Sequence, residues 1–208
     1  MHQPYSDADA NQLYHALFCD DLEPVTPAPG EAAAPWQRAL MAGPAFTGSL
    51  RRLVEDPSGD ARVRALACHR LRELGHVVHP RRLFGVVIEV PRHGGLDTLA
   101  VYADGGLRLL RGQGTLTLAE AGNERERQAV QAVLEAGNQV VHGPGVAPQP
   151  RSAPSLQAAR VTFIASDGLY AHQDTLERLR VHPQAAAVLH AAQGLLHALA
   201  DTELPVAA

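Results

Sequence analysis

The feature that most constrains the fold of this chain is a series of apolar segments separated by glycine-containing turns, LFGVVIEVPRHGGLDTLAVYADGGLRLLRGQGTLTL. LFGVVIEV is dominated by β-branched residues, which favour extended backbone, and predicts a buried strand over residues 83–90. RHGGLD turns the chain before a second strand over 97–103, and the dipeptide DG predicts a tight hairpin before a third strand over 107–111. TLTL alternates as a half-exposed fourth strand does, so we expect an antiparallel meander.

Helical periodicity flanks this meander on both sides. Asp60 can cap a helix that continues to about Leu74, and Gly75 offers the left-handed residue that ends it. Asn123 can cap another helix, in which Gly137 lies on the apolar stripe and indicates close packing. A short helix is expected to carry Leu13, Leu17 and Phe18, and three further helices are expected to begin near Pro35, Pro44 and Pro183. A short turn of helix is expected around DTLERL, capped by Asp174 and Glu177. The last helix is expected to point Val188, Ala192, Leu195, Leu196 and Leu199 inward.

ARVTFIASDGLYA predicts a later hairpin that joins the same sheet. Helices, meander, helix, hairpin and helix then follow one another, an order typical of an α+β fold rather than of alternating βαβ units. We expect one α+β domain over 1–208, with proline-rich loops at 20–35 and 143–157. Helices covering an antiparallel sheet are similar to the profilin-like or roadblock-like plan, and such a likeness carries no function.

Composition argues against several classes of partner. The formal charge is −4 and all 18 basic residues are arginine, so we expect no general attraction to nucleic acid or to an anionic membrane. Only 4% of the residues are aromatic, too few for a surface that stacks on bases. Cys19 and Cys68 are the only cysteines, which fits a reducing compartment, and no signal or membrane-spanning segment is recognisable. The expected location is the cytoplasm.

Metal chemistry is not favoured by the spacing of its candidate ligands. These candidates are Cys68, His69, His76 and His79. HVVH lies between a glycine and a proline, so the segment is expected to be extended and its two rings to point to opposite sides. His190 and His197 share a helix face, but no carboxylate or third ligand accompanies them. We expect no metal and no cofactor.

Catalytic patterns are incomplete. Ser166, Asp167 and His172 are suitable residue types, but Asp167 and the glycine after it are typical of a hairpin turn rather than of a nucleophile elbow. RHGGLD and ADGGLR lie between expected strands, where they make turns instead of cradling a phosphate. No catalytic residue is predicted.

A ligand-binding hypothesis remains for polar and aromatic residues near the ends of the two hairpins. They are Asp97, Tyr102, Asp167, Tyr170 and His172. If they converge at one end of the sheet they form a small pocket. The alternative is that the aspartates cap turns and each tyrosine has one solvated end.

The segments LFGVVIEV, GLDTLAVYADG and VTFIASDGLY together resemble a family of uncharacterised bacterial proteins of about this size, over roughly residues 60 to 200. This resemblance implies a bacterial protein of one domain and carries over no activity and no site residues. Because the expected fold is a helix-covered antiparallel sheet and no catalytic constellation is recognised, we expect a non-catalytic interaction or scaffold module that binds a protein partner or self-associates through a sheet edge or the last helix. The alternatives are a small-ligand-binding or hydrolase-like enzyme that uses the hairpin residues, and a metal-binding regulator.

Overall fold

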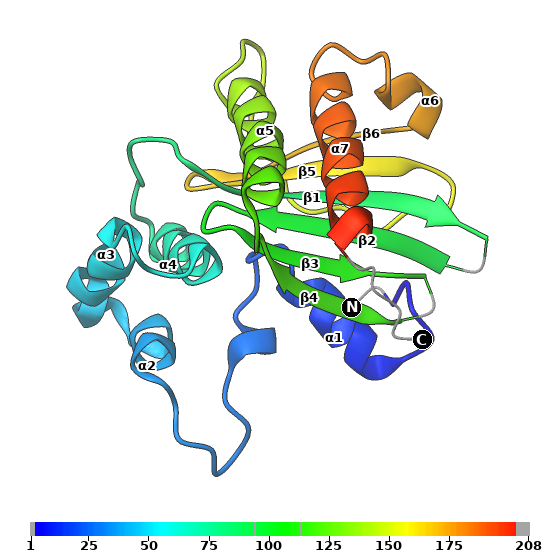
Figure 1. Ribbon diagram of the computed structural model, residues 1–208. Coiled ribbons are helices and arrows are strands. Elements are labelled where there is room, and N and C mark those ends of the chain that lie inside the picture. Colours follow the sequence, from blue (N-terminus) through cyan, green and yellow to red (C-terminus); the bar gives the residue numbers. More distant parts are fainter. Residues whose placement is uncertain (1–2, 94, 113, 203–208) are drawn as a thin grey trace.

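The computed structural model describes residues 3–93, 95–112 and 114–202 and has an α+β fold (Figure 1). Its centre is a six-stranded antiparallel sheet of order β4-β3-β2-β1-β5-β6. The strands are β1 (Leu83–Arg92), β2 (Gly95–Tyr102), β3 (Gly106–Leu110), β4 (Leu116–Glu120), β5 (Ala159–Ala165) and β6 (Gly168–Asp174). The predicted fold class is confirmed, because the meander β1–β4 and the later hairpin β5–β6 form one sheet.

The helices pack into two cores, one on each face of the sheet. The N-terminal helices are α1 (Ala8–Ala16), η1 (Glu23–Val25), α2 (Pro35–Met41), η2 (Pro44–Phe46), α3 (Thr47–Glu55) and α4 (Ala61–Glu73). The later helices are α5 (Glu124–Val141), α6 (Leu176–Leu179) and α7 (Ala186–Thr202). From Val86 onward the side chains of β1 alternate between the cores, as a strand requires: Val87 faces α1 and α4, whereas Val86 and Ile88 face α5 and α7. Phe84 also faces α1 and α4, because the register shifts between Leu83 and Gly85.

Two helix starts are fixed by the predicted capping residues. A carboxylate oxygen of Asp60 accepts a hydrogen bond from the backbone N–H of Arg62 at 2.8 Å, and α4 follows at once. The side chain of Asn123 accepts one from the N–H of Glu126 at 2.9 Å, which completes a capping box at the start of α5. Gly75 has the positive φ of +80° expected beyond the end of α4.

Two predictions of where an element ends or how it is capped are wrong. Strand β1 does not end before Pro91 but continues to Arg92, and beyond Glu89 it pairs with β2 alone. The proline therefore lies where the ladder on one side has already ended. Helix α6 is capped by Thr175, whose hydroxyl accepts from a backbone N–H of the first turn at 3.4 Å, whereas Asp174 accepts from the N–H of Thr175.

A charged pair is buried between α1 and the sheet. The side chains of Glu89 and Arg160 are each 2% exposed, and their nearest charged atoms lie 3.5 Å apart. The Tyr14 hydroxyl donates to Glu89 at 2.7 Å, and Arg160 donates to the carbonyl of Ser152 at 2.8 Å. Burial raises the pKa of Glu89, and the charge of Arg160 opposes that rise. The pair therefore ties α1 and the loop 143–157 to the sheet.

The outer edge of β6 is covered by the second proline-rich loop. The backbone N–H of Gln149 donates to the carbonyl of Leu169 at 2.7 Å, and its side-chain amide donates to that of Ala171 at 2.9 Å. Strand β4 forms the opposite edge, and no other described segment pairs with its outer side. Within the described ranges, none of the helices combines the length and the apolar character needed to cross a lipid bilayer.

Candidate functional site

A hollow of about 520 Å³ lies between the sheet and α7. Its apolar lining comes from three neighbouring strands and from one face of α7: Ile88, Val90, Leu99, Leu109, Leu189 and Leu196. Its polar lining includes Arg92, Asp97, Arg111, Arg180 and His190. Apolar surface with a few polar groups at one side is the usual make-up of a binding site.

A second hollow, of about 310 Å³, continues the first along α7. The two share Leu99, Leu109, Arg111 and Leu196, so they form a single groove, which we call the α7 groove. From Leu189 to Ala200, its wall on α7 extends for about 16 Å, at 1.5 Å per residue. The end beside the C-terminal part of α7 is lined by Glu120.

The floor of the groove is a row of paired residues that crosses the strands. Ile88 of β1 lies opposite Leu99 of β2, which lies opposite Leu109 of β3, which in turn lies opposite Thr117 of β4. The axes of α5 and α7 also cross the strands (Figure 1). The row therefore runs alongside α7.

A second, outer row carries charge. Val90 lies opposite Asp97. This pair is two residues from the pair of Ile88 and Leu99, towards the Arg92 end of β1, and is therefore on the same face of the sheet. Asp97 accepts from the backbone N–H of Gly112 at 2.9 Å and from Arg92 at 3.2 Å. Arg111 lines the same part of the groove.

Two arginines give the first hollow a net positive charge: Arg180 lines this hollow alone, and Arg111 lies where the two hollows meet. Within the described part of the chain, the guanidinium groups of Arg111 and Arg180 make no hydrogen bond or ion pair. Asp97 is already shared with Arg92, so it does not neutralise them. Each guanidinium group is available to an anionic group of a ligand in the groove.

Leu196 was expected to point into the core, and this prediction is wrong because the residue is 39% exposed in the groove. Its neighbour Leu195 is fully buried against the core that contains α5. Consecutive helix residues are about 100° apart, so α7 presents Leu195 to the core and Leu196 to the groove. The apolar surface of α7 is thus wider than its core contact requires.

The structure brings Asp167 and Tyr170 of the five hairpin residues together, at the turn between β5 and β6. The Tyr170 hydroxyl donates to Asp167 at 2.8 Å, and Arg81 donates to the same carboxylate oxygen at 2.6 Å. Burial and this carboxylate raise the pKa of Tyr170 to about 12. Arg81 also donates to the carbonyl of Val141 at 2.7 Å, so the cluster fastens the turn to the end of α5.

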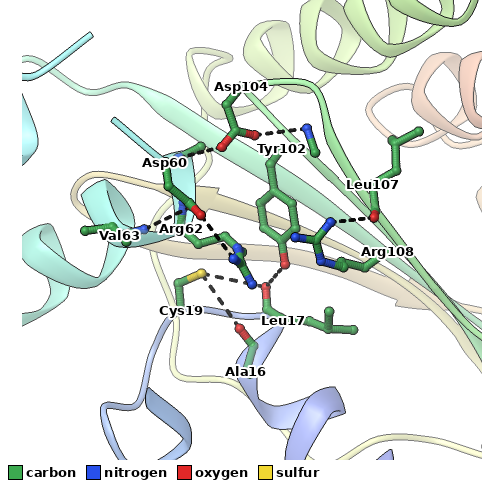
Figure 2. A network of polar contacts seen from close by, with 12 residues as sticks. Ala16, Leu17, Cys19, Asp60, Arg62, Val63, Tyr102, Asp104, Leu107 and Arg108 are labelled. Carbon is green, nitrogen blue, oxygen red and sulfur yellow. Dashed lines mark hydrogen bonds and ion pairs between the residues drawn. The ribbon is translucent and has the colours of Figure 1, made fainter. Parts of the chain in front are cut away.

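Tyr102 lies in a different network, on the opposite face of the sheet (Figure 2). Its hydroxyl donates to the carbonyl of Leu17 at 2.8 Å, and the guanidinium carbon of Arg62 lies 5.8 Å from its ring centroid. Next to it, Asp104 accepts from the backbone N–H of Ala61 at 2.8 Å. Burial raises the pKa of Tyr102 well above its usual range. The network joins the end of α1, the start of α4 and the hairpin β2–β3.

The same view contains Cys19, whose thiol points at the carbonyls of Ala16 and Leu17, each 3.9 Å from the sulfur (Figure 2). Burial raises the pKa of the Cys19 thiol and raises that of Cys68 to about 11. The thiolate is the nucleophilic form, so both cysteines are poorly disposed for nucleophilic chemistry at neutral pH.

His172 packs on the α7 face of the sheet between two rings. Its centroid lies 4.7 Å from that of His182 and 6.2 Å from that of Phe163. Its Nε2 atom is buried and has no hydrogen-bond partner among the described residues. Burial, together with His182, lowers the pKa of His172.

The five hairpin residues are therefore not one cluster. Asp97 pairs with Val90 near the end of β1, whereas Tyr102 pairs with Gly85 near its beginning, about 17 Å away at 3.3 Å per residue. Only Asp97 lines the α7 groove. A ligand-binding role for these residues stays a prediction.

Across residues 3–93, 95–112 and 114–202, no group of three or more histidine, cysteine, aspartate or glutamate side chains is placed to hold a metal ion. Comparison with protein-family models, curated proteins and solved structures finds no match to this chain. The candidate site is therefore defined by the geometry of the α7 groove. The sequence did not indicate that Arg111, Arg180 and Leu196 belong to a site. The signal that the sequence offered for this site was an apolar surface on the last helix that is wider than a single stripe.

Proposed function

We propose that this protein is a non-catalytic interaction module that binds a polypeptide partner in the α7 groove. The observation that carries the proposal is the groove itself, a continuous apolar surface with Leu196 exposed in its middle. Two arginines border it, Arg111 in the middle and Arg180 at the end beside α6, and neither guanidinium has a partner among the described residues. Exposed apolar surface that is contiguous and bordered by charge commonly marks an interaction site.

The shape of the groove favours a polypeptide over a small molecule. Pockets for small molecules enclose most of the surface of their ligand. The α7 groove is instead elongated, with a wall from Leu189 to Ala200 and an exposed leucine between them. A partner that lies along α7 would cover Leu196 and both rows of the floor.

The proposal can be tested by selecting peptides of about 20 residues from a random library on the full chain. A helix of that length spans about 30 Å and covers the groove. Leu196→Arg places a long charged side chain in the groove, and Leu13→Arg is its matched control, because both leucines are helical and 39% exposed. We expect selected peptides to bind the wild type and Leu13→Arg equally, and to lose about tenfold or more in affinity for Leu196→Arg.

Two results would contradict this proposal. If selection yields no peptide that distinguishes Leu196→Arg from the wild type, the groove is not a polypeptide-binding surface. A dimer of the full chain at micromolar concentration that Leu196→Arg dissociates would assign the groove to a second copy of this chain instead of a different partner.

A further inference from the structure

We infer that the partner segment is an acidic amphipathic helix that lies alongside α7 with its carboxylates facing Arg111 and Arg180. This inference rests on the proposed function. It also specifies the conformation, the orientation and the charge of the segment, none of which the proposed function fixes.

The first argument is space. Strand β1 has ten residues and is therefore about 33 Å long. Helix α5 covers its beginning, where a Cβ at Gly137 would lie 2.9 Å from Val86, and α7 lies beside α5 (Figure 1). Packed helices lie about 8–10 Å apart, so two of them cover about 20 Å of the strand. The remainder, at the Arg92 end, is about as wide as one further helix.

The second argument is backbone hydrogen bonding. The floor row lies on a face of the sheet, where Ile88, Leu99 and Leu109 are each paired with a strand on both sides. An extended segment placed there would find no strand edge to pair with. A helix satisfies its own backbone groups and needs only an apolar stripe.

The third argument is the arrangement of apolar side chains. The floor row of Ile88, Leu99 and Leu109 and the α7 wall of Leu189 and Leu196 meet at an angle along the groove. A helix with apolar residues at positions i, i+3, i+4 and i+7 would contact the floor and the wall at once.

The fourth argument is charge. Arg111 lines the outer part of the floor and Arg180 the end beside α6, whereas Glu120 lines the opposite end. Carboxylates on the flank of the partner helix that faces away from α7 would pair with the two arginines. We expect them to lie between the end of the partner helix beside α6 and its middle, which is the span from Arg180 to Arg111.

The experiment uses the library peptides whose binding depends on the groove. We expect them to carry net negative charge and to gain helical circular dichroism on binding the full chain. Charge reversal by Arg111→Glu with Arg180→Glu should weaken them by about tenfold or more, and exchanging their glutamates for lysines should restore binding to that variant. The control is Arg51→Glu with Arg52→Glu, which makes the same change in net charge on exposed positions of α3 and should leave affinity unchanged.

The outcomes separate this inference from the proposed function. Three results would contradict the acidic helix but not the interaction module. The peptides that depend on Leu196 could be neutral or basic, bind in an extended form, or bind the charge-reversed variant as tightly as the wild type. Failure to recover any groove-dependent peptide would overturn both. All four arginines are exposed or half-exposed, so an unchanged thermal melt is expected and checks that the variants are folded.

Discussion

Gly137 of α5 lies against Val86 of β1 so closely that a Cβ atom at Gly137 would be 2.9 Å from Cγ2 of the valine and 3.0 Å from a methyl group of Leu83. The absence of a side chain at this position brings the helix down onto the beginning of β1. The position of α5 in turn sets that of α7 beside it, and therefore the width of sheet that stays uncovered at the Arg92 end.

Substitution of this glycine should destabilise the protein. Gly137→Ala must push apart well-packed side chains, and we expect the free energy of unfolding to fall by about 1–3 kcal/mol. Gly194, in α7, is the matched control, because a Cβ there meets nothing within 4 Å. Gly194→Ala should raise stability by about 0.5–1 kcal/mol through helix propensity. Urea unfolding of both variants measures the two changes, and equal signs would contradict this account of α5 packing.

The carboxylate of Asp104 should contribute to stability over a long sequence separation. It accepts from the backbone N–H of Ala61, 43 residues away, and from that of Gly106 within its own turn. Asp104→Ala leaves both N–H groups without this acceptor, so we expect a loss of about 1–2 kcal/mol in unfolding free energy. Asp104→Asn keeps one acceptor oxygen and should lose less. If Asp104→Ala unfolds at the same denaturant concentration as the wild type, the carboxylate contributes nothing to stability.

Removal of the buried anion Glu89 should lower the free energy of unfolding by more than the loss of the Asp104 carboxylate does. Glu89→Gln leaves the guanidinium of Arg160 buried without its charged partner, and the expected loss is about 3–5 kcal/mol. Glu55, exposed on α3, is the control for the same chemical change. Chemical denaturation of both variants at neutral pH provides the comparison. A Glu89→Gln protein as stable as the Glu55→Gln protein would show that the pair is not needed to hold α1 and the loop 143–157.

The partly buried ring of His172 should make stability depend on pH. Its pKa is lowered in the folded protein, so the unfolded chain takes up the proton first as pH falls, and the stabilisation present above pH ~6.5 is lost below it. We expect the free energy of unfolding to fall between about pH 7.5 and pH 5, and His172→Phe to reduce that fall. His197→Phe, on an exposed position of α7, serves as control. An unchanged slope in His172→Phe, measured by urea titration at each pH, would count against the His172 imidazole as the source of the pH dependence.

Most of the fold could be predicted because its signals are local. Asp60 and Asn123 cap the helices that follow them directly, and Gly75 provides the left-handed residue within a few positions of a helix end. The dipeptide at Asp104 and Gly105 marks the turn between β2 and β3 from two residues alone. Such signals need no knowledge of what packs against them.

The groove could not be predicted because it depends on elements that meet only in the folded chain. Arg111 directly follows β3 and Arg180 directly follows α6, and nothing in their sequence neighbourhoods indicates that they border one surface. Leu196 fits a core stripe as well as an exposed one, because the choice depends on which side of α7 the helix α5 occupies. Glu89 left a sequence signal, a charge inside an apolar strand, but its partner is 71 positions further along the chain.

The loop that covers β6 limits how these molecules can assemble. Gln149 already occupies the carbonyls of Leu169 and Ala171, so a strand from another molecule would have to displace it. Growth of a fibre by strand pairing needs two reactive edges on every subunit, as a polymer needs a monomer with two functional groups. In the described part of the chain, β4 is the one outer strand of this sheet whose edge is open. Strand pairing between two molecules through β4 therefore ends at a dimer, because Gln149 blocks the edge at β6 where a third molecule would add.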